Sequence, residues 1–206
     1  MNARLRAVLP NAITMVRLVL AVAFLAVLLR ARHQDCQCRA DLGTLATVLF
    51  IVAALSDILD GYLARRWQVV TRFGRIMDPF GDKLLVLGAL VALVAPGLAE
   101  GSGIDPWVVL LVLGRELFVT SVRAVAEADG VQFAADRWGK IKMFLQCLAL
   151  PFAIFVATHA DTQDSASWLL WRDSTRWAMI LSTALSAIPY AIRAVGLLRP
   201  LGGGAR

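Results

Sequence analysis

The chain has 206 residues, of which 59% are hydrophobic and only 17% are charged. Soluble proteins contain about 45–50% apolar residues, and a globule of this length could not bury such an excess. The composition therefore excludes a water-soluble enzyme, and it excludes a disordered chain because disorder requires low hydrophobicity. The formal net charge of +6 is typical of membrane-protein loops that face anionic lipid and the cytosol, and we expect no nucleic-acid partner.

Six stretches contain roughly the 20 apolar residues that a membrane-spanning helix needs. Helices are favoured because lipid offers the backbone no other hydrogen-bond partner. We predict an all-α, polytopic integral membrane protein, with a single membrane domain over residues 1–199 and a flexible, glycine-rich tail over 200–206. The six predicted transmembrane helices are Ala12–Leu29, Leu42–Arg65, Pro79–Leu98, Pro106–Ala126, Ile141–Thr158 and Trp177–Leu198.

The basic residues predict how these helices are oriented. Of the 21 Lys and Arg residues, 13 lie at the helix ends that share a side with the termini, and five lie at the opposite ends. The other three, Arg17, Arg115 and Arg123, lie within the helices. The positive-inside rule then places both termini and the second and fourth connections in the cytosol.

Four aspartates lie where the second and third helices approach the cytosol. Asp57 and Asp60 are three residues apart, so they share a helix face, and Asp78 and Asp82 are one turn apart. Pro79 leaves open whether Asp78 caps the third helix or lies in a kinked one. Four carboxylates cannot share a low-dielectric pocket unaided. Two divalent cations with oxygen ligands, Mg²⁺ or Mn²⁺, would neutralise them.

The alternative is that each aspartate simply pairs with an arginine at the membrane boundary. The joint spacing favours a motif instead, because D-x2-D-G-x2-A-R-x8-G-x3-D-x3-D fixes eight positions within 26 residues. These positions are Asp57, Asp60, Gly61, Ala64, Arg65, Gly74, Asp78 and Asp82.

This string resembles the signature of the CDP-alcohol phosphotransferase family at every fixed position. The resemblance implies transfer of a substituted phosphate from a CDP-linked donor to an acceptor hydroxyl, with release of CMP. It implies that the four aspartates bind two magnesium ions and that Asp82 also accepts the hydroxyl proton. Arg65 would hold the diphosphate, and Gly61, Ala64 and Gly74 would make room for the nucleotide. It also implies a homodimer.

The fourth and fifth helices carry a second group of charges. Arg115 and Arg123 lie within the fourth helix, and Lys140 and Lys142 lie where the fifth leaves the cytosol. A buried arginine needs an anionic partner, and we expect these four cations to bind the phosphate of the acceptor. The alternative is an internal pair, either Arg115 with Glu116 or Arg123 with Glu127.

Three further segments resemble the phosphatidylglycerophosphate synthase branch of the family. They are PN-x2-T-x2-R at Pro10–Arg17, GREL-x-VT-x2-R at Gly114–Arg123 and GK-x-K with a later Gln at Gly139–Gln146; Met143 stands where the branch usually has Thr. The resemblance implies CDP-diacylglycerol and sn-glycerol 3-phosphate as substrates and an active site on the cytosolic side of the inner membrane. Thr14 would contact the nucleotide and Arg17 a substrate; the alternative is a structural role for both residues, with Arg17 neutralising a carboxylate.

Two alternative functions remain at this point. The same chemistry could use another acceptor, such as inositol phosphate or phosphatidylglycerol, because an inositol phosphate also needs a cationic pocket. A magnesium transporter would instead place acidic residues across the depth of the bilayer. In this sequence the acidic cluster lies at one end of the helices, which disfavours the transporter.

Overall fold

The computed structural model describes residues 3–34, 36–67, 72–129 and 137–198. At 3–10, 36, 58–67, 72–73, 75–76, 78, 137 and 196–198 it describes the backbone alone. Over these residues the chain is helical and contains no strand, which agrees with the predicted all-α class. The long helices are α1 (Ala3–Ala31), α2 (Cys36–Trp67), α3 (Arg72–Leu93), α5 (Pro106–Ala128), α6 (Arg137–Thr158) and α8 (Ala166–Leu198), and the short ones are α4 (Ala99–Ser102) and α7 (Ala160–Gln163).

The long helices occupy the predicted segments, but several predicted ends were wrong. Helix α8 begins at Ala166 rather than Trp177, because hydropathy marks the apolar part of a helix and not its polar turns. Helix α1 begins at Ala3, but its candidate span, Asn11–Ala31, agrees with the predicted Ala12–Leu29. Helix α3 ends at Leu93 rather than Leu98, since Pro96 is followed by Gly97 in the left-handed region at φ +90°. The predicted tail over 200–206 lies outside the described residues.

The question that Pro79 left open is answered by the backbone. Helix α3 begins at Arg72, so Pro79 lies inside it and Asp78 is not an N-cap. Over the described residues, four helices are long and apolar enough to cross a membrane, at Asn11–Ala31, Gln37–Asp57, Trp138–Thr158 and Ala166–Val195. Helix α5 is of similar length, but Arg115, Glu116 and Arg123 interrupt its apolar sequence.

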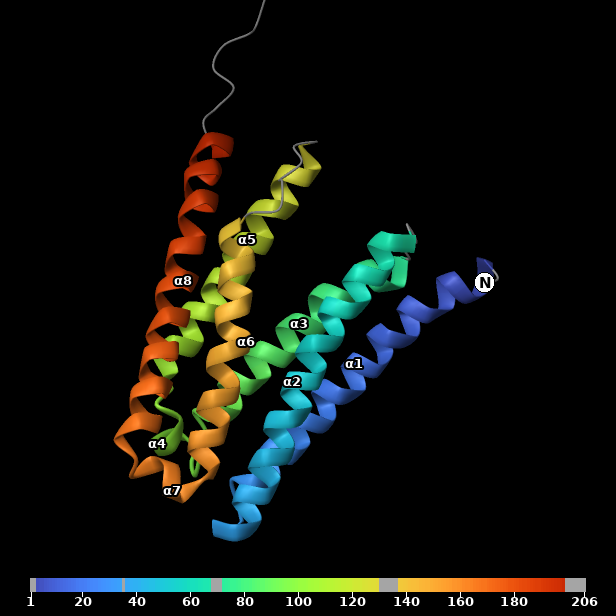
Figure 1. Cartoon of the computed structure of the whole chain (residues 1–206). Helices are drawn as coiled ribbons and strands as arrows, with labels where there is room; N and C mark the ends of the chain where they lie inside the picture. The colour runs from blue at the N-terminus through green and yellow to red at the C-terminus, as the bar shows by residue number, and fades with distance from the viewer. Residues whose placement is uncertain (1–2, 35, 68–71, 130–136, 199–206) are drawn as a thin grey trace, which may run out of the picture.

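The helices run up and down the bundle (Figure 1). The first turns of α1 and the last turns of α2, α5 and α8 lie toward one end, which we call the terminal end. The turn between α1 and α2 lies at the opposite end with α4 and α7, and we call this the basal end. Helix α1 packs along α2 over the most extensive helix–helix contact, and it also contacts α3.

Helices α1 and α2 meet along buried stripes with alternating steps of three and four residues, the spacing of an antiparallel helix pair. Phe24 and Phe50 meet edge to face in this seam, with ring centroids 5.4 Å apart. The stripe of α1 consists of Thr14, Arg17, Ala21, Phe24 and Leu28, and that of α2 of Ala46, Phe50 and Ala53, whereas Gly43, three residues earlier, lies against Thr158 of α6. Asp57 is the next position on the α2 stripe, which directs it toward the Arg17 part of α1.

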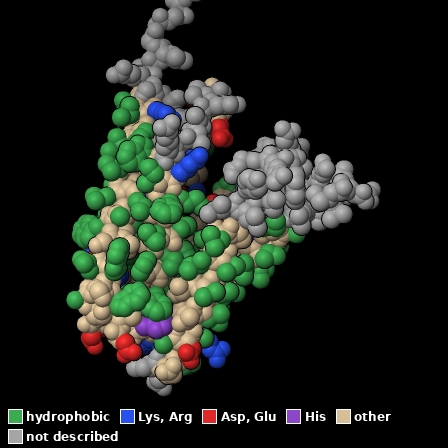
Figure 2. Space-filling view, viewed as in Figure 1, with side chains coloured by type: hydrophobic (Ala, Val, Ile, Leu, Met, Phe, Trp, Pro, Cys, Tyr) green, Lys and Arg blue, Asp and Glu red, His purple; other side chains and the backbone are tan. Residues whose placement is uncertain are grey.

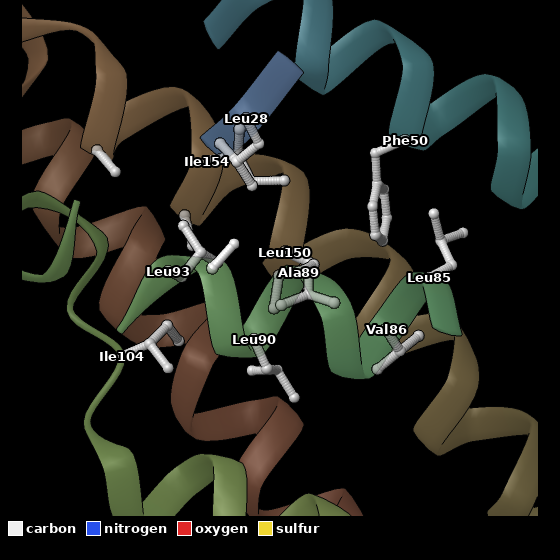
Figure 3. Packing of buried hydrophobic residues seen from close by; sticks show 14 of the residues in the cluster. Leu28, Phe50, Leu85, Val86, Ala89, Leu90, Leu93, Ile104, Leu150 and Ile154 are labelled. Atoms are coloured by element: carbon white, nitrogen blue, oxygen red, sulfur yellow. The ribbon is translucent and has the colours of Figure 1, made fainter. Parts of the chain in front are cut away.

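Helix α3 passes through the middle of the bundle and carries much of the core. Figure 3 shows its Leu85, Ala89 and Leu93 on the side toward Leu28 of α1, Phe50 of α2, and Leu150 and Ile154 of α6, whereas Leu90 points to the opposite side. The outward faces are also apolar: Val19, Leu110, Phe144 and Ile192 are each more than 60% exposed. Figure 2 shows hydrophobic side chains over the middle of the visible face and charges near its ends, as expected for a surface in lipid.

The basal end is tied together by arginines. Arg39 Nη1 donates to the carbonyl of Gly97 at 3.3 Å, and Arg172 Nη1 donates to that of Gly101 at 2.9 Å. Arg176 donates to the carbonyl of Gly103. These bonds satisfy carbonyls of the connection between α3 and α5, so three of the five basic residues at these helix ends have a structural role.

Candidate active site

Arg17 joins two of the predicted metal ligands. Its Nη1 donates to Oδ1 of Asp82 on α3 at 2.8 Å and also to Oδ1 of Asp57 on α2. The Arg17 side chain is 1% exposed, and the two carboxylates are 21% and 35% exposed. The structure therefore shows the carboxylate-neutralising alternative for Arg17. Thr14, one turn earlier, is buried on the same face of α1.

The remaining members of the aspartate motif are placed only by their helices. Asp60, Gly61, Ala64 and Arg65 lie in α2, and Asp78 lies in α3, but their side chains are outside the described residues. Gly74 is partly buried in the first turn of α3. Within the described side chains, no group of three or more His, Cys, Asp or Glu residues gathers as a metal site would require.

The two described aspartates nevertheless suit a divalent cation. Their oxygens come from different helices and converge on one positively charged atom, the Arg17 Nη1. Carboxylate oxygens are the ligands that Mg²⁺ prefers. The bonds from Arg17 show that the carboxylates of Asp57 and Asp82 together stabilise a positive charge at this point.

A cavity of about 540 Å³ connects Asp82 with the cations of α5 and α6. Five of the described residues that line it are basic and three are acidic. The basic ones are Lys83, Arg115, Arg123, Lys140 and Lys142, and the acidic ones are Asp82, Glu116 and Glu127. The four cations predicted to bind the acceptor phosphate thus line one cavity together with the predicted proton acceptor.

Glu116 anchors two of these cations. Its Oε1 accepts a hydrogen bond from Arg115 Nη1 at 3.1 Å and another from Lys142 Nζ. Arg115 and Lys142 are both buried, so these pairs limit the cost of keeping charge away from water. The internal Arg115–Glu116 pair that the sequence left as an alternative is therefore present, and both cations still line the cavity.

Arg123 has an aromatic partner instead of an acidic one. Its Nη2 donates to the Tyr190 hydroxyl at 2.6 Å, and the structure shows no ion pair between Arg123 and Glu127, both of which it describes. Lys83, which sequence reasoning assigned only to orientation, lines the same cavity and donates to Thr120 Oγ1 at 2.7 Å.

Sequence reasoning missed two residues of α8 that contact this group. Ser186 Oγ accepts a hydrogen bond from Arg115 Nε at 3.0 Å, and Tyr190 contacts both arginines. A serine and a tyrosine in a largely apolar helix carry no charge that would distinguish them. The available signal was their spacing of one turn, which places them on one face.

The arrangement combines the elements of a phosphoryl transfer. A carboxylate that can receive a proton lies at one part of the cavity wall, and guanidinium and ammonium groups suited to phosphate oxygens lie at another. Fixed positive charge of this kind stabilises the negative charge of phosphate groups as bonds change.

Comparison with known proteins agrees with this chemistry. The family model described as CDP-alcohol phosphatidyltransferase matches residues 7–193. Over 169 residues the chain is 37% identical to the CDP-diacylglycerol–glycerol-3-phosphate 3-phosphatidyltransferase of Bacillus subtilis, covering 74% of this chain and 83% of the relative. Over 192 residues it is 35% identical to the enzyme of the same name from Cereibacter sphaeroides, covering 92% and 80%.

A third relative covers nearly the whole chain. It is the probable phosphatidylglycerophosphate synthase of Mycobacterium tuberculosis, 33% identical over 195 residues, which are 95% of this chain and 84% of the relative. The family match spans the aspartate motif, the cavity cations and most of α8. The chain belongs to the CDP-alcohol phosphatidyltransferase family.

Proposed function

We propose that this enzyme transfers the phosphatidyl group of CDP-diacylglycerol to sn-glycerol 3-phosphate, giving phosphatidylglycerophosphate and CMP. The observation that carries the proposal is the cavity in which Asp82 and four predicted phosphate-binding cations meet. The described charged residues of its lining have a formal sum of +2, which suits the double negative charge of a phosphate monoester. The names of the relatives support the same pair of substrates.

The reaction needs a nucleophile, a leaving group and a place for one proton. The acceptor hydroxyl oxygen forms a bond to the phosphorus that carries diacylglycerol, and the bond from that phosphorus to the CMP oxygen breaks. CMP leaves with the electron pair of that bond. The hydroxyl proton passes to the Asp82 carboxylate, a transfer worth about 10²–10⁴-fold in rate when a group is well placed.

The remaining roles follow from the family resemblance. Asp57, Asp60, Asp78 and Asp82 would hold two Mg²⁺ ions, which supply charge stabilisation for the diphosphate and the departing CMP. Arg65 would bind the diphosphate, with Gly61, Ala64, Gly74 and Thr14 beside the nucleotide. Arg115, Arg123, Lys140 and Lys142 would bind the phosphate of the acceptor.

The placement in the membrane is part of the proposal. Six helices would span the inner membrane, with both termini and the cavity on the cytosolic side. In Figure 1 the first turns of α1 and the last turns of α8 lie well apart but toward the same end of the bundle, which supports termini on one side. The family resemblance supports a homodimer, which the mass of the purified protein in detergent would test.

An acceptor panel tests the function directly. Purified protein with CDP-diacylglycerol and Mg²⁺ is offered glycerol 3-phosphate, inositol 3-phosphate, serine or phosphatidylglycerol, and CMP release is measured. We expect CMP release with glycerol 3-phosphate alone. Preferential release with another acceptor would overturn the assignment of the substrate. Turnover that persists in chelator would overturn the proposed metal site.

A further inference from the structure

Helix α8 contacts both arginines of the proposed acceptor site from one face. Ser186 is fully buried and Tyr190 is 1% exposed. Ser186 Oγ accepts from Arg115 Nε, and the Tyr190 hydroxyl accepts from Arg123 Nη2. The Tyr190 ring also lies 5.9 Å from Arg115 Cζ and 5.4 Å from Arg123 Cζ, within the range of cation–π contacts.

The two arginines need such partners because their own helix does not hold them both. Arg115 and Arg123 are two turns apart on α5, and only Arg115 lies on its buried stripe. Arg123 is an exposed residue, so without Tyr190 its flexible side chain is free to turn toward solvent. Within the described part of the chain, Arg115 without Ser186 keeps its contacts with Glu116 and the Tyr190 ring. Binding a phosphate would then require both guanidiniums to be ordered first.

We propose that Ser186 and Tyr190 are positioning residues for acceptor recognition, which hold the guanidiniums of Arg115 and Arg123 ready for a phosphate monoester. The inference rests on the proposed function for the identity of the acceptor. Serine and tyrosine suit this role because they accept hydrogen bonds from the guanidiniums without neutralising their charge. A carboxylate at either place would cancel charge that the phosphate needs.

The chain provides a matched control for Ser186. Ser182 lies one turn earlier on α8, is also buried, and donates to a backbone carbonyl three residues before it, as Ser186 does. Neither serine lines the cavity, but of the two it is Ser186 that bonds to one of the cavity's cations, Arg115. A general effect of removing a buried hydroxyl from α8 will therefore be the same in Ser182→Ala and Ser186→Ala.

The test measures CMP release by wild type, Ser182→Ala, Ser186→Ala, Tyr190→Phe and Tyr190→Leu while each substrate is varied separately. We expect Ser186→Ala and Tyr190→Leu to raise the KM for glycerol 3-phosphate about tenfold, and Tyr190→Phe, which keeps the ring, about threefold. The KM for CDP-diacylglycerol and the kcat at saturating acceptor should change less than twofold. Ser182→Ala should match wild type.

Three results would overturn the inference: an unchanged acceptor KM, an equal rise in both KM values, or equal effects of Ser182→Ala and Ser186→Ala. If Tyr190→Leu does not yield monodisperse protein, Ser186→Ala and Tyr190→Phe decide the question. Calorimetric binding of inorganic phosphate to the same proteins requires no turnover. If wild type does not use glycerol 3-phosphate but Ser186→Ala still binds inorganic phosphate more weakly than wild type does, the positioning role is supported and the proposed acceptor is rejected.

Discussion

Arg17 is the residue that joins the first three helices at the candidate site. A charged side chain within a membrane span costs about 2.5–3.5 kcal/mol on insertion scales, and Arg17 is almost fully buried. Its bonds to Asp57 and Asp82 offset that cost and hold carboxylates from α2 and α3 together. Replacing Arg17 would remove the bonds that offset the charge of both carboxylates, so Arg17 contributes both to stability and to the geometry of the site.

We expect Asp82→Asn to reduce CMP release by at least about 10²-fold, because the amide cannot take up the proton of the acceptor hydroxyl. The variant retains the size of the side chain, so the protein should still insert and purify as wild type does. Rates of CMP release and gel-filtration profiles measure the two effects. Asp105→Asn, an exposed position at the start of α5, is the acidic control, and wild-type turnover by Asp82→Asn would refute the proton-acceptor role.

Arg123→Ala should raise the KM for glycerol 3-phosphate about tenfold or more and leave the KM for CDP-diacylglycerol nearly unchanged. The reason is that a charge-assisted contact to the acceptor phosphate is lost, whereas the lipid donor binds elsewhere. Arg30→Ala, exposed at the basal end of α1, provides a control for loss of a positive charge. A larger effect on the KM for the lipid donor would assign Arg123 to the nucleotide.

The charged part of the site could be predicted from the sequence because charge is rare in these helices. Arg115, Lys142 and Asp82 interrupt apolar segments, and the structure places all three around one cavity. The uncharged partners could not be found in the same way. Ser186 and Tyr190 belong to the site only because α8 packs against α5, and this contact depends on the tertiary structure.

At the scale of the helices, the buried stripes carry most of the information about packing. In α1 the exposed face is as apolar as the buried one, with Val16, Val19 and Val22 exposed, so hydropathy alone does not show which positions the structure buries. Helix ends were less predictable because a helix continues beyond its apolar part, as α8 does before Trp177. The end of α3 depends on the conformation of Gly97, whose Cβ, if it had one, would lie 2.7 Å from the carbonyl oxygen of Arg32.

Gly43 tests how closely α2 and α6 must pack. A Cβ at this position would lie 2.0 Å from Thr158 Oγ1 and 2.2 Å from Thr158 Cβ, so Gly43→Ala forces the helices apart. We expect a loss of about 1–3 kcal/mol in stability, typical of overpacking, seen as a lower unfolding temperature in detergent. Thr158→Gly in the same chain should recover part of the loss.

Gly114→Ala is the matched control for that substitution. A Cβ on Gly114, which also lies in a long helix, meets nothing within 4 Å. The unfolding temperature should stay unchanged or rise slightly, since alanine favours helix more than glycine does. Equal destabilisation by Gly43→Ala and Gly114→Ala would show that loss of glycine, rather than the α2–α6 contact, is responsible.

At the scale of the whole molecule, the two ends of the bundle differ in construction. The basal end is closed by arginines that bind the backbone of the α3–α5 connection. The cavity lies between the middle of α3, the second half of α5, the first turns of α6 and Tyr190 of α8, toward the terminal end. This polarity fits an enzyme whose soluble substrate arrives from one side of the membrane.

Reporter fusions test which end of the bundle faces the cytosol. A fluorescent protein fused after Arg206 should fold and fluoresce, because we place the C-terminus in the cytosol. Alkaline phosphatase inserted at Asp164, between α7 and α8, should be active because this connection is then outside. Active phosphatase at the C-terminus together with an inactive insertion at Asp164 would reverse the proposed orientation.

The contribution of α8 to the cavity has a consequence for the order of synthesis. Domains form from the N-terminus as the chain emerges, and the α1–α2 seam, Asp57 and Asp82 are complete before α8 is made. Ser186 and Tyr190 are translated after all of these residues, and they hydrogen-bond to Arg115 and Arg123. A nascent chain that lacks α8 therefore carries Asp57 and Asp82 without these two partners of the arginines, and under the proposed function it should bind the acceptor poorly.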